Sequence, residues 1–356
     1  MKILQVIPYF CFGGAETMCE NLTYALLSLG HDVTVVSLYQ ERTPISQRME
    51  KAGVKILYLD KKLGLDVSMV PKLMKIMRQE KPDVVHTHLD VIKYATLAAK
   101  LSGVKQCVHT VHSVAHKEAE GIQQKIINYT YYHLGWSVPI ALSTEIQETI
   151  SEFYHLKKSK IPVIRNGVDL SKCMVKEDYS LGSPINLIHV GRFDIPKNHA
   201  GLLRSFAKIH AVYSESTLHL LGDGDLRKDM ETLALDLGIA DAVHFHGMQA
   251  DIYPYLQKSD IFLLPSIYEG NPMSIIEAMG TGLPIVATMV GGIPDMVRDR
   301  HSALLVPCEE AAFSDACLEL LADETLRSSL GRQARLDSAQ FGAEYMAQQY
   351  SDVYRK

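Results

Sequence analysis

Several patterns are missing from this sequence of 356 residues, and each absence narrows the class of protein. No apolar run approaches the roughly 18 residues of a membrane-spanning helix, and Pro8 breaks the short run at the N-terminus, which favours a first strand over a signal peptide. The six Cys form no C-x-x-C pair, so we expect the reduced thiols of a cytoplasmic protein. The motifs G-x-G-x-x-G and G-x-S-x-G are also absent, which disfavours NAD binding and argues against a serine hydrolase.

Charge of either sign is modest overall but unevenly distributed. The formal net charge of −5 argues against a general nucleic-acid binder. Residues 1–165 contain 20 Lys and Arg against 15 Asp and Glu, whereas residues 166–356 contain 16 against 26. The first half is therefore basic and the second half acidic, which indicates different surfaces on the two halves.

Short apolar runs alternate with helix-length amphipathic stretches along the whole chain. Continuous Val, Ile and Leu runs are typical of parallel strands covered by helices on both faces. The predicted strands are 3–7, 32–38, 55–59, 83–86, 106–110, 138–141, 185–190, 217–221, 242–246, 261–264, 284–287 and 303–306. Because one core usually stops growing near about 250–300 residues, two series of strands predict an α/β protein with two doubly wound parallel-sheet (Rossmann-like) domains.

Pro162, Asn166 and Gly167 mark the predicted joint between the two domains. The predicted boundaries are 1–165 for the first domain and 166–340 for the second, with a C-terminal helix at 341–356 that packs back toward the first domain. Ligands of open α/β sheets bind beyond the carboxyl ends of the strands, so the informative residues should follow the apolar runs.

A glycine pair follows the first predicted strand. Gly13 and Gly14 permit a tight turn and a close backbone approach, and Glu16 opens the next helix. Such a turn can hold a phosphate or a sugar near a helix N-terminus, although a plain turn explains the pattern as well.

Two cations, Arg192 and Lys197, share the loop after the first strand of the second half. Arg with its planar fork and Lys as a point charge can together hold a diphosphate. The alternative is a solvated loop in which Asn198 caps the next helix.

Two glutamates eight residues apart, Glu269 and Glu277, bracket the start of a predicted helix. Asn271 is expected as its N-cap and Pro272 as its first residue, which directs free backbone N–H groups toward the preceding loop. A carboxylate within the apolar run 275–279 needs a partner, and the vicinal hydroxyls of a ribose would supply one. Alternatively, Glu277 pairs with an Arg or faces solvent.

Taken together, these motifs resemble family 4 of the retaining, nucleotide-sugar-dependent glycosyltransferases, which have the GT-B fold. The resemblance rests on Gly13-Gly14-Ala15-Glu16, on Arg192 with Lys197-Asn198, and on Glu269-x7-Glu277. Shorter matches occur in the same order along nearly the whole chain, namely PDVVHTH, TVHS, RNGVD, GDGDLR, HFHG and LLPSIYEGNPMSIIEAMGTGLPIVAT. The family fold implies two Rossmann-like domains that face a central cleft, the first receiving the acceptor and the second binding the donor.

The resemblance also implies roles for the residues of the second half. Arg192 and Lys197 hold the donor diphosphate, Glu277 binds the ribose hydroxyls, and Glu269 reaches hydroxyls of the transferred sugar. Backbone amides of the loop after the tenth predicted strand assist at the diphosphate, and this loop contains Glu269, Gly270, Asn271, Met273 and Ser274. Gly270-Asn271-Pro272 stands where many members have Gly-Phe-Gly, so the number of amides at the phosphates is left open.

Further roles follow by position from the same resemblance. Gly13 and Gly14 let the first loop approach the donor, and His112 in TVHS corresponds to the active-site histidine that reaches the sugar. Backbone next to His246, at Gly247 and Met248, is where such enzymes bind the base. The implied catalytic set is His112, Glu269, Arg192 and Lys197.

Two other patterns invite a metal-binding interpretation. Asp223-Gly224-Asp225 has the D-x-D form, but a turn at Gly224 with Asp225 capping the next helix explains it. The histidines of HTVHSVAH (109–116) and HFH lack a suitably spaced Cys ligand. We therefore expect neither a metal nor another cofactor.

The expected activity is transfer of a sugar from a nucleotide diphosphate, most simply UDP, to a hydroxyl of a glycan or lipid-linked acceptor, in surface polysaccharide or glycoconjugate biosynthesis. Two alternatives stay open: a nucleotide-sugar epimerase of similar architecture, and an inactive homologue that only binds nucleotide-sugar.

A basic stripe adds an expectation about location. Lys72, Lys75, Arg78 and Lys81 recur at three-residue spacing on a predicted helix, and Lys157, Lys158 and Lys160 form a second cluster. They form either a solvated helix face or a surface attracted to an anionic membrane. The second interpretation predicts a cytoplasmic protein in peripheral contact with the inner face of the cell membrane.

Overall fold

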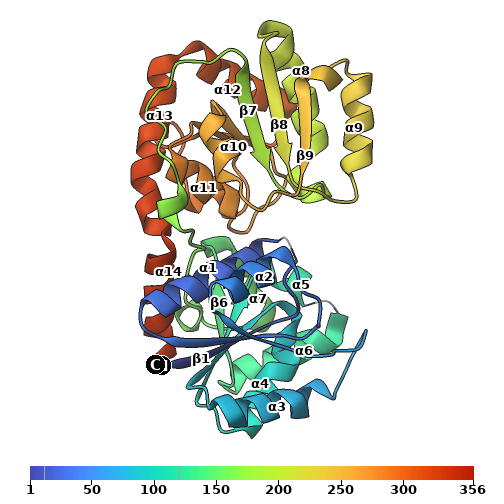
Figure 1. Cartoon of the computed structure of the whole chain (residues 1–356), viewed down its shortest axis with the longest axis vertical. Coiled ribbons are helices and arrows are strands. Elements are labelled where there is room, and N and C mark those ends of the chain that lie inside the picture. Colours follow the sequence, from blue (N-terminus) through green and yellow to red (C-terminus); the bar gives the residue numbers. More distant parts are fainter. Residues whose placement is uncertain (12, 120) are drawn as a thin grey trace. The chain divides into compact units, whose positions relative to one another are not determined.

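The computed structural model describes residues 1–11, 13–119 and 121–356, which divide into two compact units (Figure 1). Unit 1 consists of Met1–Gly167 together with Ala343–Lys356, and unit 2 of Val168–Gly342. The divisions thus fall after Gly167 and Gly342, each two residues beyond the boundaries expected after residues 165 and 340. The second unit is inserted between two segments that belong to the first.

Each unit contains a six-stranded sheet in which every neighbouring pair is parallel. The strand order is β3-β2-β1-β4-β5-β6 in unit 1 and β12-β11-β10-β7-β8-β9 in unit 2. The strands of unit 1 are β1 Lys2–Ile7, β2 Asp32–Ser37, β3 Lys55–Tyr58, β4 Val84–His88, β5 Gln106–Val111 and β6 Val138–Ala141. Those of unit 2 are β7 Ile185–Val190, β8 Ser216–Leu221, β9 Val243–Gly247, β10 Ile261–Leu264, β11 Ile285–Thr288 and β12 Leu304–Val306.

The sheets are flanked by helices, as the continuous apolar strands predict. In unit 1 these are α1 Gly14–Ser28, α2 Pro44–Lys51, α3 Met69–Glu80, α4 Ile92–Leu101, α5 Ala115–Glu118, α6 Gly121–His133, α7 Thr144–Tyr154 and α14 Ala343–Tyr354. In unit 2 they are α8 His199–Val212, α9 Arg227–Asp236, α10 Tyr253–Lys258, α11 Met273–Thr281, α12 Glu310–Ala322 and α13 Glu324–Asp337. Among the described residues, no helix combines the length and the apolar composition that crossing a membrane requires.

The cores lie between the sheets and these helices. In unit 1, buried residues of β1, β4 and β5 pack against α3 and α4. In unit 2, buried residues of β7, β8 and β10 pack against α8, α9 and α12. The prediction of two doubly wound parallel-sheet domains is therefore confirmed, and each of the twelve predicted strands is present within two residues of its expected bounds.

The strand order determines where each unit can bind a ligand. In both sheets the order reverses between the first and fourth strands of the series, that is between β1 and β4 and between β7 and β10. Neighbouring loops at such a switch point leave the sheet toward opposite faces, which opens a crevice at the carboxyl ends of the two strands. Most of the predicted site residues lie in or just beyond the loops that follow β1, β7 and β10, whereas His112 follows β5 and Gly247 ends β9.

Candidate active site

Lys197 and Glu269 meet at the switch point of unit 2. Lys197 ends a short 3₁₀ turn (Ile195–Lys197) after β7, and Glu269 lies in the loop after β10. The Lys197 Nζ atom donates to Glu269 Oε1 over 2.6 Å, and the Ser266 hydroxyl donates to the same oxygen, also over 2.6 Å. With its side chain only 7% exposed, Glu269 is a buried carboxylate held by a cation and a hydroxyl.

Arg192, by contrast, is turned to solvent. Its side chain is 69% exposed, and its Nε atom donates to Asp194 Oδ2 over 2.8 Å. Asn198 caps α8 by accepting from the Gly201 amide, as the alternative interpretation of this loop predicts. The loop therefore begins a helix, and each of its two cations is paired with a carboxylate of the same unit.

The backbone of Glu269 is fixed by the loop after β11. The Gly292 amide donates to the Glu269 carbonyl over 2.9 Å. Gly291 has a φ of +57°, and a Cβ atom on it would lie 1.8 Å from the same carbonyl oxygen. Only glycine combines this left-handed conformation with so close an approach, so Gly291 sets the position of Glu269.

Helix α11 begins one residue later than predicted, and its N-cap is different. Its first residue is Met273, Pro272 occupies the N-cap position, and no side chain caps the helix. The prediction that Asn271 caps and Pro272 opens the helix is therefore wrong, because the extended backbone of Pro272 (ψ 123°) delays the first turn. The first helical amides belong to Met273 and Ser274, both buried beside Asn271, and Gly270 is partly exposed.

Glu277 has no ion-pair or hydrogen-bond partner for its carboxylate among the residues that the structure describes. It is partly buried on α11, and burial raises the pKa of Glu277 to about 7, against a smaller opposite effect of Lys172. The predicted alternative of an Arg partner is thus not observed within the described chain. The residue as a whole nevertheless retains some exposure.

Asp223-Gly224-Asp225 has structural contacts of its own. The Asp223 carboxylate accepts from the Gly224 amide and from Arg227, while backbone bonds join Asp223 and Leu226 to Phe193. Helix α9 begins at Arg227 with Leu226 as its N-cap and no side-chain cap. The prediction that Asp225 caps this helix is therefore wrong, but the segment does brace the loop that carries Arg192.

The predicted base-binding segment lies at the end of β9. The Gly247 carbonyl accepts from the Gly222 amide over 2.9 Å, and the His246 carbonyl accepts from the Gln249 side chain over 2.7 Å. The Met248 side chain is exposed. This segment is therefore an ordered backbone edge with one apolar side chain in solvent.

In unit 1 the glycine pair begins α1. Gly13 is the N-cap in an extended conformation rather than part of a tight turn, and a Cβ atom on it would lie 2.5 Å from the Glu16 carboxylate. Gly14 has no heavy atom within 4 Å of such a Cβ position. The space beside Gly14 is thus open, whereas a Cβ atom on Gly13 would require the Glu16 side chain to shift.

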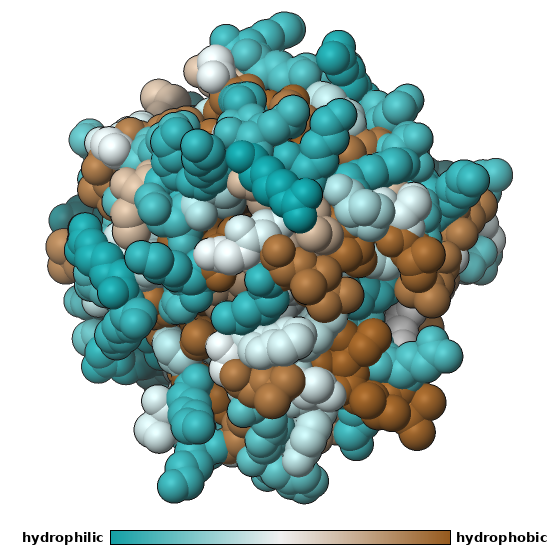
Figure 2. Space-filling view, turned by 90° about the horizontal axis from the view of Figure 1, so that it is seen from below, coloured by the Kyte–Doolittle hydropathy of each residue, from teal (hydrophilic) through white to brown (hydrophobic). Residues whose placement is uncertain are grey.

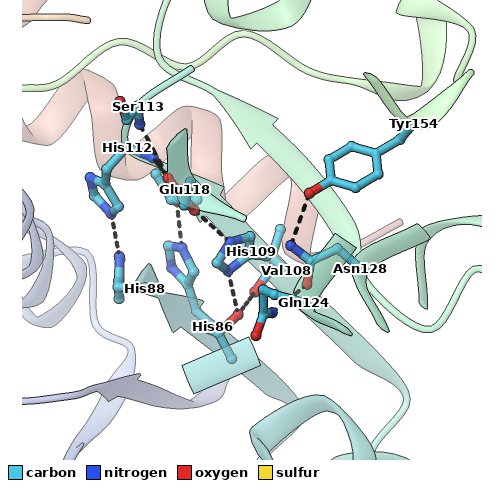
Figure 3. Close-up of polar contacts among 12 residues, drawn as sticks. His86, His88, Val108, His109, His112, Ser113, Glu118, Gln124, Asn128 and Tyr154 are labelled. Atoms are coloured by element: carbon cyan, nitrogen blue, oxygen red, sulfur yellow. Dashed lines mark hydrogen bonds and ion pairs between the residues drawn. The ribbon is translucent and has the colours of Figure 1, made fainter. Parts of the chain in front are cut away.

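His112 follows β5 and is held at both its backbone and its ring (Figure 3). Glu118 Oε2 accepts from the amides of His112 over 2.5 Å and Ser113 over 3.1 Å. The ring Nε2 atom lies 3.1 Å from Nδ1 of His88. Burial lowers the pKa of His112 to about 4, against an opposite effect of Glu118, so the imidazole is neutral near pH 7.

A separate cavity of about 230 Å³ lies in unit 2 beside the loop after β10. Its lining includes Asn198, Pro265 and Cys308 but neither Glu269 nor Glu277.

Among the described residues, no group of three or more His, Cys, Asp or Glu is arranged to hold a metal ion.

Sequence reasoning did not single out Ser266, Glu118 or His88, although each contacts a predicted site residue. Ser266 and Glu118 carry no pattern that separates them from other polar residues. His88 ends the VHTH segment, where its place at the carboxyl end of β4 beside the switch point is the available signal.

Comparison with known proteins places the chain in a family. Residues 12–172 match the model described as Glycosyltransferase Family 4, and residues 184–323 match the model described as Glycosyl transferases group 1. A galactosyltransferase of Escherichia coli, UDP-Gal:alpha-D-GlcNAc-diphosphoundecaprenol alpha-1,3-galactosyltransferase, is 30% identical over 281 residues, covering 73% of this chain and 72% of its own. N-acetyl-alpha-D-glucosaminyl L-malate synthase of Bacillus anthracis is 28% identical over 381 residues, covering 99% and 97% of the two chains.

A solved structure agrees in fold. HepE of Anabaena in complex with UDP superposes over 100% of both chains with a TM-score of 0.86 at 19% identity. Two parallel sheets of Rossmann-like order, two family models that together span most of the sequence, and a relative of this similarity lead to one assignment. The chain belongs to glycosyltransferase family 4 and is a glycosyltransferase with the GT-B fold.

Proposed function

We propose that this glycosyltransferase moves a sugar from a UDP-sugar, with retention of anomeric configuration, to a hydroxyl of a glycan or lipid-linked acceptor. The pathway is biosynthesis of surface polysaccharide or glycoconjugate. The E. coli relative is named for a UDP-Gal donor and a diphosphoundecaprenol acceptor. HepE has also been solved with UDP-glucose, again with a TM-score of 0.86.

The observation that supports a nucleotide donor most directly is that the Glu277 carboxylate has no partner among the described residues and has a raised pKa. An ionised carboxylate on a partly buried residue, without a partner within the described chain, is costly unless something else binds it. Two vicinal hydroxyls would donate to its two oxygens, one hydrogen bond each, and a ribose carries such a pair. Glu277 is therefore the proposed ribose-binding residue, and Gly247 and Met248 the proposed neighbours of the base.

The proposed chemistry depends on charge that develops on the leaving diphosphate. Lys197, Arg192 and the first amides of α11 are the groups that would stabilise this charge without a divalent metal. Glu269 is already held by Lys197 and Ser266, which suits a group that binds sugar hydroxyls rather than a free nucleophile. We therefore propose attack by the acceptor on the same face as the departing diphosphate, whose oxygen takes the acceptor's proton, with His112 at the sugar.

The test is a panel of UDP-, GDP- and ADP-sugars incubated with the protein and followed by mass spectrometry. Slow release of UDP supports the proposal, an isomerised donor indicates an epimerase, and an unchanged donor in every case indicates an inactive nucleotide-sugar-binding homologue. The same panel is run in excess EDTA. Activity that disappears with EDTA and returns with Mn²⁺ or Mg²⁺ would contradict the metal-independent mechanism.

For the acceptor side we propose peripheral contact with an anionic membrane through the surface around α3. Lys75 and Arg78 are exposed on this helix, whereas Lys72 pairs with Asp60. In the loop before α3 the side chains of Leu63, Leu65 and Val67 are 92%, 70% and 72% exposed. Figure 2 shows apolar surface interspersed with hydrophilic residues on the face of the molecule seen from below.

This apolar loop is ordered by Lys61. Its Nζ atom donates to the Gly64 carbonyl over 2.7 Å and to the Lys62 carbonyl over 3.0 Å. The Asp66 carboxylate accepts from the Lys62 amide over 2.9 Å. Because these bonds hold the backbone in place, the aliphatic side chains can enter a lipid surface without first ordering the loop. Cations beside exposed aliphatic side chains favour binding to an anionic lipid surface. This arrangement suits a lipid-linked acceptor better than a soluble one.

A further inference from the structure

A chain of hydrogen bonds runs from helix α1 through the first sheet to His112. The Thr23 hydroxyl donates to the Cys19 carbonyl over 2.7 Å, and the Gln5 amide nitrogen donates to Thr23 over 2.8 Å. Gln5 Oε1 lies 3.0 Å from Nε2 of His88, and His88 Nδ1 lies 3.1 Å from Nε2 of His112. Figure 3 shows the contact between the two histidines. All these residues belong to unit 1.

The buried end of this hydrogen-bond series determines which group donates and which accepts at every step. The Thr23 hydroxyl gives its one hydrogen to the Cys19 carbonyl, so it can only accept from Gln5. This places the amide oxygen of Gln5 toward His88, and the Cys19 thiol donates to that oxygen as well, over 3.4 Å. The opposite amide orientation would set NH₂ against the thiol hydrogen and the oxygen against a hydroxyl that has no hydrogen left to give.

The protonation of both rings follows from this direction. An amide oxygen only accepts, so Nε2 of His88 carries a hydrogen. Burial lowers the pKa of His88 well below its usual range, hence its ring is neutral and its Nδ1 bears a lone pair. That lone pair accepts from Nε2 of His112, which therefore carries the hydrogen.

We propose that Gln5 and His88 are positioning residues that hold His112 as the neutral Nε2–H tautomer and leave Nδ1 as its free acceptor. His112 then receives a hydrogen bond from a sugar hydroxyl through Nδ1 and does not donate a proton to the leaving group. The second part of this inference depends on the proposed function. The first part concerns the free protein alone.

Glu118 has a different task at the same loop. It binds the His112 and Ser113 amides and receives His109 Nε2 at 2.9 Å, but it makes no described contact with the ring of His112. The His86 ring lies tilted against the His88 ring with centroids 4.2 Å apart, and its own nitrogens contact Tyr354 and Thr110. The tautomer of His112 is therefore set through His88 and Gln5, while Glu118 sets its backbone.

The direct test is a long-range ¹H–¹⁵N spectrum of the whole protein with ¹⁵N-labelled histidine. The His112 signals are identified as those lost in His112→Gln. We expect a protonated shift at Nε2 and an unprotonated shift at Nδ1. The opposite pattern in the wild-type protein would overturn the proposal without recourse to any positioning variant.

Variants then test what fixes the tautomer. Gln5→Met removes the acceptor with little change in length, so we expect His112 to become a mixture of tautomers. Thr110→Val is the matched control, since it removes a hydroxyl that contacts His86 on the neighbouring strand and should leave the His112 shifts unchanged. An unmixed His112 in folded Gln5→Met, or the same mixing in Thr110→Val, would show that Gln5 has no such role. Should Gln5→Met fail to fold, His88→Asn serves in its place with the same expected mixing.

The kinetic arm separates this inference from the proposed function. Once a donor is known, Gln5→Met should lower kcat on the order of tenfold with little change in KM, a loss of the size seen when metal-binding histidines lose the partner that orients the ring. If the tautomer is as predicted but no nucleotide-sugar reacts, the proposed function fails and the hydrogen-bond chain stands. If donor turns over and kcat in Gln5→Met equals that of the wild type, the positioning role is excluded.

Discussion

At the scale of single residues, the charged groups of Glu277 and Lys197 affect both the stability of the fold and the proposed binding of the donor. Glu277 is ionised only against the cost of burial, which raises its pKa to about 7. Lys197 lies in an ion pair with buried Glu269 that a diphosphate would have to share or replace. For each residue we therefore predict how a change in its charge alters the free energy of unfolding and, separately, donor binding or turnover.

Glu277 should make nucleotide binding and stability depend on pH with opposite signs. The folded protein holds the Glu277 proton up to a pKa of about 7, whereas the unfolded chain releases it near the ordinary glutamate pKa of 4.5. The free energy of unfolding should therefore fall as pH rises through this window, while affinity for the ribose hydroxyls rises as the carboxylate ionises. Calorimetric titration of UDP-sugar on either side of pH 7, with urea unfolding at the same pH values, measures both.

The control is Glu277→Gln. In this variant the free energy of unfolding and the nucleotide affinity should both depend less on pH, and nucleotide binding should weaken by roughly 1–3 kcal/mol. A 2′-deoxy donor should cost the wild type far more affinity than it costs the variant. Equal losses in the two proteins would show that the carboxylate does not bind the ribose.

Lys197→Ala should lower turnover on the order of 10²-fold or more, because a transition-state charge loses its cation. It should also destabilise the fold, since Glu269 is left buried without its ion-pair partner. In Lys197→Ala/Glu269→Gln the lost stability should partly return while turnover stays low. Denaturant unfolding and steady-state rates are measured for the wild type and the two variants. Recovery of stability and turnover together would mean that Lys197 acts only through Glu269.

At the scale of elements, the site residues depend on loops that meet at the switch point of each sheet. In unit 2 the loop after β11 touches the loop after β10 at Gly291, and the segment after β8 braces the loop after β7. Single residues such as Glu269 therefore lie where they do because of backbone contacts between neighbouring loops.

Gly291→Ala should abolish most activity, because its Cβ would lie 1.8 Å from the Glu269 carbonyl and would force that loop away. Gly238→Ala is the matched control. Gly238 has a φ of +69° with nothing within 4 Å of a Cβ, so the substitution carries only the left-handed backbone strain of about 1 kcal/mol. Turnover and melting temperature are compared, and equal effects of the two substitutions would show that the contact with Glu269 is unimportant.

The elements were predictable from the sequence to a greater degree than the contacts of the site. Runs such as Ile261–Leu264 are apolar throughout because both faces of a parallel strand are covered, and this pattern is local. The cap of α11 was mispredicted, since Asn-Pro is a good local start signal that the extended Pro272 backbone overrides. The Ser266–Glu269 and Glu118–His112 contacts could not be predicted although they are local, because irregular loop backbone has no periodicity that relates sequence spacing to side-chain direction.

At the scale of the whole molecule, the basic stripe and the apolar loop before α3 predict where the protein works. Vesicles that contain anionic lipid should bind the protein at low salt and release most of it at high salt, because ions screen the electrostatic part of the attraction. A Lys75→Glu/Arg78→Glu variant should lose binding, and a Leu63→Ser/Leu65→Ser variant should lose the part that resists salt. Co-sedimentation measures all three, and wild-type protein that stays in the supernatant at low salt would favour a soluble acceptor.

The two-part composition of unit 1 has a consequence for how the protein is made. Helix α14 supplies Tyr354 to His86 and Tyr350 to Thr110, both buried in the first sheet. These tyrosines are synthesised after all of unit 2, which is one continuous segment. A chain growing from its N-terminus thus possesses the whole of its second unit before it possesses the whole of its first. The half that is synthesised first is the half completed last, and every ribosome that stops before α14 releases a protein whose first sheet still lacks its closing helix.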